Sequence, residues 1–175
     1  MRIEAKRLYL RELTDADCTA SYLAWLNDPE IARFLETRHT PQTLDMIRQF
    51  VASVNARDNE HLFGIFLHDR DRHIGNIKVG PIHAYHRMGD VSLWIGDRDA
   101  WGRGYATEAI VAASRHAFDA LGAVKLSASM YELNQGSYRA FIKAGYRDEG
   151  RRRAHYAFEG GRSDVLVTGL TPEDL

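Results

Sequence analysis

Two glycines separated by one arginine stand directly before a helix-forming run, in the stretch DAWGRGYATEA at residues 99–109. The first amide N–H groups of a helix have no partner inside the helix, and the helix dipole makes this end electropositive. Glycines in front of the helix remove side chains that would block a ligand. The N–H groups of Gly102 to Thr107 could therefore bind a phosphate, with Arg103 adding a positive charge. The alternative is a strand-to-helix turn that binds no ligand.

Two known phosphate-binding motifs do not fit this stretch. It is too short for a P-loop and lacks the Gly-Lys-Ser/Thr ending of that motif. It also lacks the third glycine of the dinucleotide-binding fingerprint. The elements around the glycines must therefore decide between a ligand site and a plain turn.

The composition is that of one globular domain over residues 1–175, with 45% hydrophobic and 27% charged residues. A formal net charge of -1 gives no electrostatic reason to expect nucleic-acid binding. The single cysteine, Cys18, excludes an internal disulfide and fits a reducing compartment. No signal-peptide core and no membrane-length apolar run is recognised, so we expect a cytoplasmic protein without a membrane partner.

The first part of the chain predicts one strand and two helices. Residues 7–13 alternate apolar and polar side chains, as a short strand does. Residues 14–28 predict a helix, because Thr14 and Asp17 have the spacing of a capping box. A second helix is predicted to open at Thr40-Pro41, a cap followed by proline at the first helical position.

From His61 onward the apolar period changes to that of strands. In the strand over 89–96, Val91, Leu93 and Ile95 should face one side of the sheet and Trp94 the other. The predicted strands are 61–67, 73–82, 89–96 and 124–130, with helices over Tyr105–Leu121 and Gln135–Ala144 and a hairpin over 146–170 that turns at Gly160-Gly161.

This order of elements predicts an α+β fold. Runs of antiparallel strands combined with two strand-helix-strand crossovers imply a mixed, mostly antiparallel sheet of about seven strands with helices packed on it.

The glycine stretch, taken with the preceding SLWIG, resembles the acetyl-CoA signature Arg/Gln-x-x-Gly-x-Gly/Ala of the GNAT N-acetyltransferase superfamily. Gly104 and Ala106 match the pattern, while Trp101 occupies the Arg/Gln position. A second family motif follows as NQGSYRAFIKAGY, Asn134 to Tyr146. The substitution at Trp101 and the following YAT resemble the branch of the ribosomal-protein N-terminal acetyltransferases, RimJ and RimL. The resemblance covers nearly the whole chain.

The resemblance implies a single GNAT-like domain with helices on both faces of the sheet and acetyl-CoA as co-substrate. Two central strands, here 90–95 and 124–130, would splay apart to form a slot for cofactor and amine. The diphosphate of CoA would lie on the loop, and the pantetheine arm would run between the first strand and the second motif. The residues implied for the cofactor are Leu93, Trp94, Ile95, Trp101, Gly102, Arg103, Gly104, Tyr105, Ala106, Thr107, Asn134 and Ser137.

Acetyl transfer requires a neutral amine, so the acceptor ammonium needs a proton acceptor. Asp90 stands where many GNAT enzymes carry a glutamate base; the alternative is a charge at an exposed strand end. His83 and His86 could replace it, because histidine titrates near neutrality, or they are loop residues on the substrate side. Their spacing predicts no metal site.

The departing thiolate of CoA benefits from a proton donor, and many relatives place a tyrosine seven residues after the asparagine of the second motif. Phe141 occupies that position here. Ser137, one helical turn earlier on the same face, is the best remaining candidate. The alternatives are that Ser137 only binds the cofactor, that Asn134 is only a helix cap, and that catalysis proceeds by positioning alone.

The segment 22–40 is expected to form the acceptor wall, as the amino-terminal helices do in the family, with Trp25, His83 and His86 as substrate-binding candidates. Trp25 is otherwise a core residue. The reaction expected is direct attack of a primary amine on acetyl-CoA in a ternary complex, without a metal. The acceptor could be a nucleotide-linked amino sugar or a protein N-terminus; antibiotics, polyamines and a homodimeric state stay open. The competing function is a GNAT scaffold that binds CoA or a partner without turnover.

Overall fold

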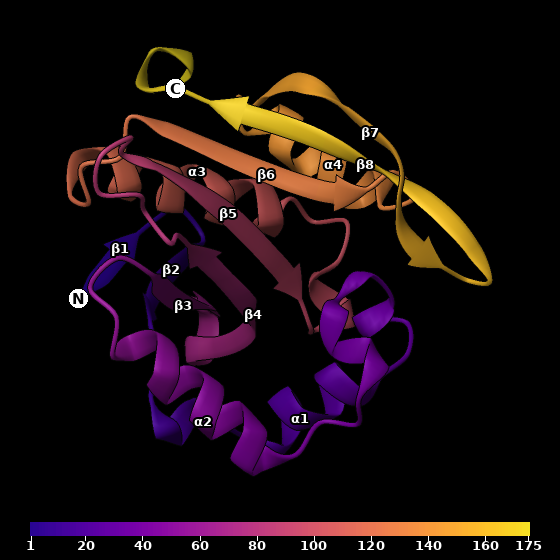
Figure 1. Ribbon diagram of the computed structural model, residues 1–175. Helices are drawn as coiled ribbons and strands as arrows, with labels where there is room; N and C mark the ends of the chain where they lie inside the picture. The colour runs from indigo at the N-terminus through magenta and orange to yellow at the C-terminus, as the bar shows by residue number, and fades with distance from the viewer.

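An eight-stranded sheet runs through the computed structural model, which describes residues 1–175. The strand order is β1-β2-β3-β4-β5-β6-β8-β7, and every neighbouring pair is antiparallel except β5 and β6 (Figure 1). The strands are β1 (Arg2–Glu4), β2 (Leu8–Glu12), β3 (His61–Leu67), β4 (Arg72–Val79), β5 (Met88–Ile95), β6 (Lys125–Tyr131), β7 (Arg147–Phe158) and β8 (Gly161–Leu170). The mixed, mostly antiparallel sheet is confirmed. The additional strand, β1, is only three residues long, which is too short for an alternation pattern to reveal.

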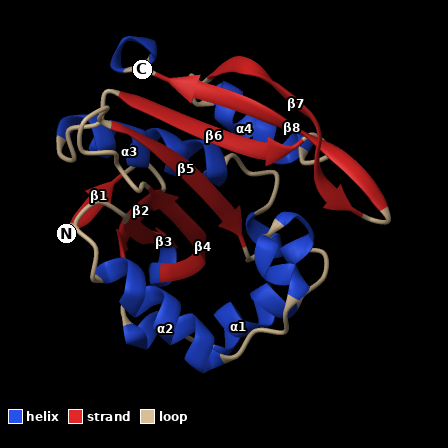
Figure 2. Cartoon of the chain, viewed as in Figure 1, coloured by secondary structure: helices blue, strands red, loops and turns tan.

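Four helices cover the two faces of this sheet (Figure 2). Helices α1 (Ala20–Asn27) and α2 (Leu44–Asn55) pack on one face, in a core cluster that includes Tyr22 and Val51. Helices α3 (Tyr105–Asp119) and α4 (Gln135–Lys143) pack on the other face, in the larger cluster. The predicted arrangement with helices on both faces is therefore confirmed. None of these helices is long and apolar enough to cross a membrane.

The region predicted as one helix over 14–28 contains a break. A 3-10 turn occupies Asp15–Asp17, and α1 begins only at Ala20, where the Thr19 hydroxyl accepts the Tyr22 N–H at 3.2 Å. Thr14 and Asp17 do form the expected capping box, but it belongs to the short turn. The prediction of one continuous helix is wrong, because Asp17 also pairs with Arg11 of β2. This pair holds the turn against the sheet before the helix starts.

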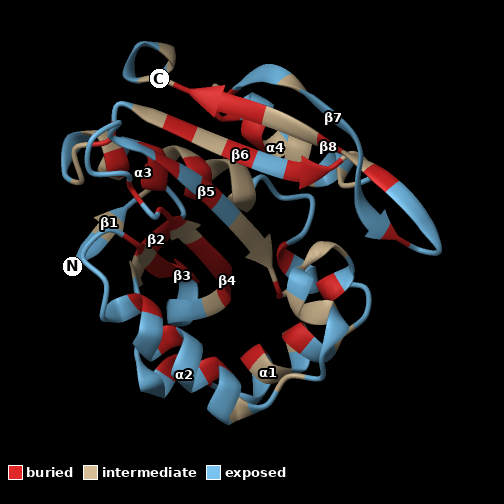
Figure 3. Ribbon diagram, in the orientation of Figure 1, coloured by how far each residue is buried: buried red, intermediate tan, exposed pale blue.

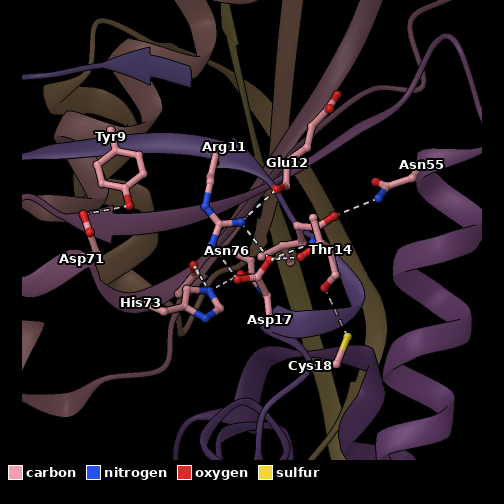
Figure 4. A network of polar contacts seen from close by, with 12 residues as sticks. Tyr9, Arg11, Glu12, Thr14, Asp17, Cys18, Asn55, Asp71, His73 and Asn76 are labelled. Atoms are coloured by element: carbon pink, nitrogen blue, oxygen red, sulfur yellow. Dashed lines mark hydrogen bonds and ion pairs between the residues drawn. The ribbon is translucent and has the colours of Figure 1, made fainter. Parts of the chain in front are cut away.

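Figure 4 shows the polar network around this turn. The Arg11 guanidinium donates to both carboxylate oxygens of Asp17, at 2.6 and 2.8 Å, and the Thr14 N–H and hydroxyl donate to the same carboxylate at 2.8 Å. Burial by itself raises the pKa of Asp17, but these hydrogen bonds outweigh it and lower the pKa to about 2. The network fixes the chain that leads into α1.

Helix α2 begins at Leu44 rather than at Thr40-Pro41. The Thr43 hydroxyl caps it by accepting the Met46 N–H at 3.2 Å. Residues before the helix are held elsewhere, since the Gln42 N–H donates to Asn27 and its side-chain amide donates to the Thr40 carbonyl. The helix start predicted at Thr40-Pro41 is therefore wrong.

Two strand ends also differ from prediction. The hairpin turns at Glu159-Gly160, one residue before the predicted Gly160-Gly161, because these two residues take the left-handed φ values of 47° and 80° that a tight two-residue turn requires. Strand β4 ends at Val79 instead of residue 82, since Pro81 has no N–H to continue the ladder. The hairpin strand β7 is exposed along nearly its whole length (Figure 3).

The parallel pairing of β5 with β6 covers only Met88–Asp90 opposite Lys125–Ser127. Beyond this point β5 continues on β4 and β6 continues on β8, so the two strands diverge, as Figure 1 shows. The splayed central pair is confirmed. Its diverging ends lead directly to the loop before α3 and to the start of α4.

Candidate active site

A cavity of about 490 Å³ lies where β5 and β6 diverge. Three parts of the chain that are far apart in sequence surround it: the end of β5 with the following loop, the start of α4, and the segment before α2. Its lining residues are Glu30, Ile31, Arg33, Phe34, Leu35, Leu93, Trp94, Ile95, Ala100, Trp101, Gly102, Gly104, Tyr105, Ala106, Asn134, Gly136, Ser137 and Ala140.

The glycine loop takes a conformation that other residues rarely adopt. Gly102 and Gly104 have φ values of 71° and 78°, and Gly104 is the N-cap of α3. A side chain added at Gly102 would meet nothing within 4 Å, so the space beside the loop is open. The N–H groups of residues 102 to 107 donate no hydrogen bond within the protein. Loop and helix start together have the features of an anion-binding site.

Strand β5 forms one wall of the cavity. Leu93 and Ile95 pack toward α3, while Trp94 packs toward α1 on the opposite face, as predicted. The indole N–H of Trp101 donates to the Ile95 carbonyl at 2.8 Å. This hydrogen bond ties the loop to the end of the strand.

The opposite wall is the first turn of α4. Asn134 caps this helix by accepting the Ser137 N–H at 3.2 Å, and both residues line the cavity. No side-chain hydrogen bond engages the Ser137 hydroxyl. Phe141 lies in the core, 2% exposed, with its ring 4.9 Å from that of Tyr146. Of the two, only Ser137 reaches the cavity.

Most of the residues expected to bind the cofactor are brought together here. The exceptions are Arg103 and Thr107, which do not line the cavity. Asp90 is also outside the lining: it is exposed and forms the last β5–β6 pair, opposite Ser127. It therefore stands where the strands part, three residues before Leu93.

The two histidines are not brought to the cavity. His83 and His86 lie in the loop before β5, with ring centroids 4.6 Å apart, and the His83 Nδ1 accepts the His86 N–H at 3.1 Å. Because β5 spans eight residues, this loop lies roughly 20 Å along the strand from the cavity. The two histidines are close to the cavity residues in sequence, but the length of β5 separates them in space.

Trp25 packs behind the cavity wall instead of lining it. Its ring lies 6.0 Å from that of Trp94 and covers Gly96, where a Cβ would approach it to 2.2 Å. It belongs with the core cluster of α1 and α2. Trp25 therefore packs against the core, which is the alternative to substrate binding.

The segment after α1 supplies contacts that sequence reasoning did not assign individually. Phe34 lines the cavity and stacks on Phe158 of β7 at 5.5 Å, and the Arg33 guanidinium donates to Glu159 at 2.9 Å. Arg33 also lines a second cavity of about 940 Å³, between this segment and the hairpin tip. These partners are more than a hundred residues apart, so no local signal could have paired them.

The model of the acetyltransferase (GNAT) domain matches residues 7–147. The chain belongs to the GNAT acetyltransferase family.

This acetyltransferase is 30% identical over 171 residues to the uncharacterized N-acetyltransferase YoaA of Bacillus subtilis, covering 96% of this chain and 95% of the relative. Its fold is similar to that of Mycobacterium smegmatis RimJ in complex with CoA-disulfide, with a TM-score of 0.86 and 19% identity. The match covers 100% of this chain and 89% of that chain. The fold is likewise similar to that of Vibrio cholerae spermidine N-acetyltransferase in complex with CoA and spermine, with a TM-score of 0.85 and 19% identity. This match covers 96% of this chain and 97% of that chain.

Family membership makes this protein an N-acetyltransferase, and the GNAT fold binds acetyl-CoA. The cavity fits that cofactor, because unpaired amides at a helix start suit a diphosphate and the apolar β5 wall suits a pantetheine arm. No group of three or more His, Cys, Asp or Glu side chains is arranged to hold a metal ion.

Proposed function

We propose that this acetyltransferase binds acetyl-CoA in the 490 Å³ cavity and transfers the acetyl group to a primary amine. The N–H groups of Gly102 to Thr107 bind the diphosphate, the backbone of Leu93–Ile95 binds the pantetheine arm, and Asn134 and Ser137 contact the arm from the other side. One observation carries this proposal. Residues from two motifs some thirty positions apart line a single cavity beside amides that have no other acceptor.

The chemistry that acetyl-CoA supplies is an activated thioester, which the amine attacks directly in a ternary complex. Asp90 accepts the proton of the acceptor ammonium through solvent, since its carboxylate is exposed at the point where the strands part. Ser137 donates to the leaving sulfur, and its hydroxyl is free to do so. Phe141 is buried and takes no part in proton transfer.

The acceptor enters beside residues 30–35, which line the cavity. Apolar side chains there, Ile31, Phe34 and Leu35, contact the part of the acceptor next to its amine. The proposal covers two classes of acceptor, small-molecule amines and a protein N-terminus. Spermidine is included among the candidates because the Vibrio cholerae enzyme is named for it.

The test is acetyl transfer to a panel of amines, with release of the CoA thiol as the measurement. The panel contains spermidine, a peptide with a free N-terminus and a nucleotide-linked amino sugar. A parallel thermal-unfolding experiment measures cofactor binding, since binding to the folded state raises Tm by mass action. A Tm that saturating acetyl-CoA leaves unchanged contradicts the proposal. A Tm increase without acetylation of any amine favours a CoA-binding module instead.

A further inference from the structure

Arg7, in the turn between β1 and β2, makes several contacts with the loop and the first turn of α3. Its Nη1 donates to the Arg103 carbonyl at 2.8 Å. Its Nε and its backbone N–H donate to the two carboxylate oxygens of Glu108, at 2.7 and 2.6 Å. Its guanidinium carbon lies 4.5 Å from the centre of the Tyr105 ring. The backbone of Arg7 is itself held by the His68 N–H at the end of β3.

The hydrogen bond to the Arg103 carbonyl fixes the direction of an amide. In a planar trans peptide the C=O and the following N–H point in opposite directions. With the Arg103 carbonyl turned toward Arg7, the Gly104 N–H points away from Arg7, and Gly104 itself lines the cavity. Glycines at 102 and 104 leave this peptide free to rotate, so an external contact is needed to hold it.

The contact with Glu108 matters for charge. Glu108 lies in the first turn of α3, and its side chain is only 16% exposed. A carboxylate without a partner at this position would repel an anionic group bound at the helix start. Arg7 neutralises it from the side of the helix that faces β2.

We propose that Arg7 is a positioning residue for the diphosphate of acetyl-CoA, acting through the loop and not through the reacting atoms. It turns the Gly104 N–H toward the ligand and removes the repulsion of Glu108. This inference rests on the proposed placement of the diphosphate on residues 102 to 107. It is specific to the diphosphate, because neither effect reaches the thioester or the acceptor.

The experiment compares two acetyl donors on the same variants. Acetyl-CoA carries the diphosphate, whereas S-acetylpantetheine lacks it. Arg7→Met keeps the apolar stem but loses the charge and the hydrogen bonds, and should raise KM for acetyl-CoA by about tenfold or more, the size expected for a lost charge-assisted contact. The kcat at saturating acetyl-CoA and the kcat/KM for S-acetylpantetheine should each change by less than about twofold. Arg7→Lys keeps the charge without bridging both acceptors and should fall between wild type and Arg7→Met.

Adding Glu108→Gln to Arg7→Met separates the two effects. The double variant should recover part of the lost affinity, because the unpaired carboxylate is gone while the carbonyl contact is still missing. Arg48→Met is the matched control: Arg48 is 45% exposed against 44% for Arg7, and it pairs with Asp15 away from the cavity. It should leave KM for acetyl-CoA unchanged.

Three results would count against the inference. Equal losses with both donors would show a general structural role, and an unchanged KM for acetyl-CoA in Arg7→Met would show no role. Wild-type protein that binds no CoA in a thermal-shift measurement would overturn the proposed function and this inference with it. Melting temperatures without ligand show whether each variant is folded.

Discussion

Gly104 has a left-handed backbone conformation that strains any other residue, and it lies in the loop beside the cavity, so mutation can separate these two properties. Gly104→Val places a branched side chain at φ 78°, where the added Cβ has only the Arg7 Nη2 within 4 Å, at 3.5 Å. We expect a stability loss of about 1–2 kcal/mol from the left-handed conformation. The new side chain lies beside the Arg7 guanidinium that holds the Arg103 carbonyl, so we expect it to displace this contact and to lower the affinity for acetyl-CoA at least tenfold, measured by calorimetry.

Gly122→Val is the control for this prediction. Gly122 has φ 72° in the turn after α3, and a Cβ there would have only an arginine side-chain nitrogen, from Arg87, at 3.9 Å. It carries the same backbone strain away from the cavity and should bind acetyl-CoA normally. Normal binding by Gly104→Val would show that the loop does not hold the diphosphate.

The proton-transfer roles proposed for Asp90 and Ser137 predict unequal losses of kcat. Asp90→Asn should keep cofactor affinity and lower kcat by roughly 10²–10⁴-fold, the range of general-base catalysis. Ser137→Ala should lower kcat less, because a thiolate can leave without full protonation. If both residues act only by positioning, both losses will be small.

The dependence of kcat on pH decides between these possibilities. An acidic limb that is present in wild type and absent in Asp90→Asn supports Asp90 as the proton acceptor. The same limb persisting in Asp90→Asn would exclude Asp90. His86→Ala then tests the alternative, although the loop of His86 lies at the far end of β5.

At the scale of elements, Asp17 links β2 to the chain that enters α1, and this link depends on pH. The folded-state pKa of Asp17 is about 2, below its ordinary value of 3.8. A lowered pKa stabilises the fold above the unfolded-state value, and this stabilisation is lost as pH falls from about 4 to about 2. The difference corresponds to about 2 kcal/mol.

Urea unfolding at pH 5 and at pH 2.5 measures this contribution. Wild type should lose more free energy of unfolding between these pH values than Asp17→Asn, which has no proton to bind there. Asp15→Asn, two residues away and with a 77% exposed side chain, should behave like wild type. Equal losses in wild type and Asp17→Asn would show that other carboxylates dominate acid unfolding.

At the scale of the whole molecule, the site exists because one strand pair is interrupted. β5 and β6 pair over three positions and then follow different neighbours, β4 and β8. Helices α1 and α2 close one face and α3 and α4 the other, so the opening remains as a cavity between two cores. The segment over 30–35, which lines this cavity, packs on the β7–β8 hairpin through contacts such as Phe34 with Phe158.

The sequence by itself determined the elements whose signals are local. Apolar periodicity placed the strands from His61 onward, and the glycines at 102 and 104 marked the loop because only local backbone geometry was needed to interpret them. The predicted helix starts were wrong where a residue outside the helix bound the segment before it, as Arg11 does for Asp17 and Asn27 does for Gln42. The tertiary structure alone decided that Arg7 meets Arg103, that Trp25 lies behind the wall, and that His83 and His86 are a strand length away. These outcomes depend on strand order and strand length, and contacts between residues far apart in the chain leave no periodic pattern in either segment.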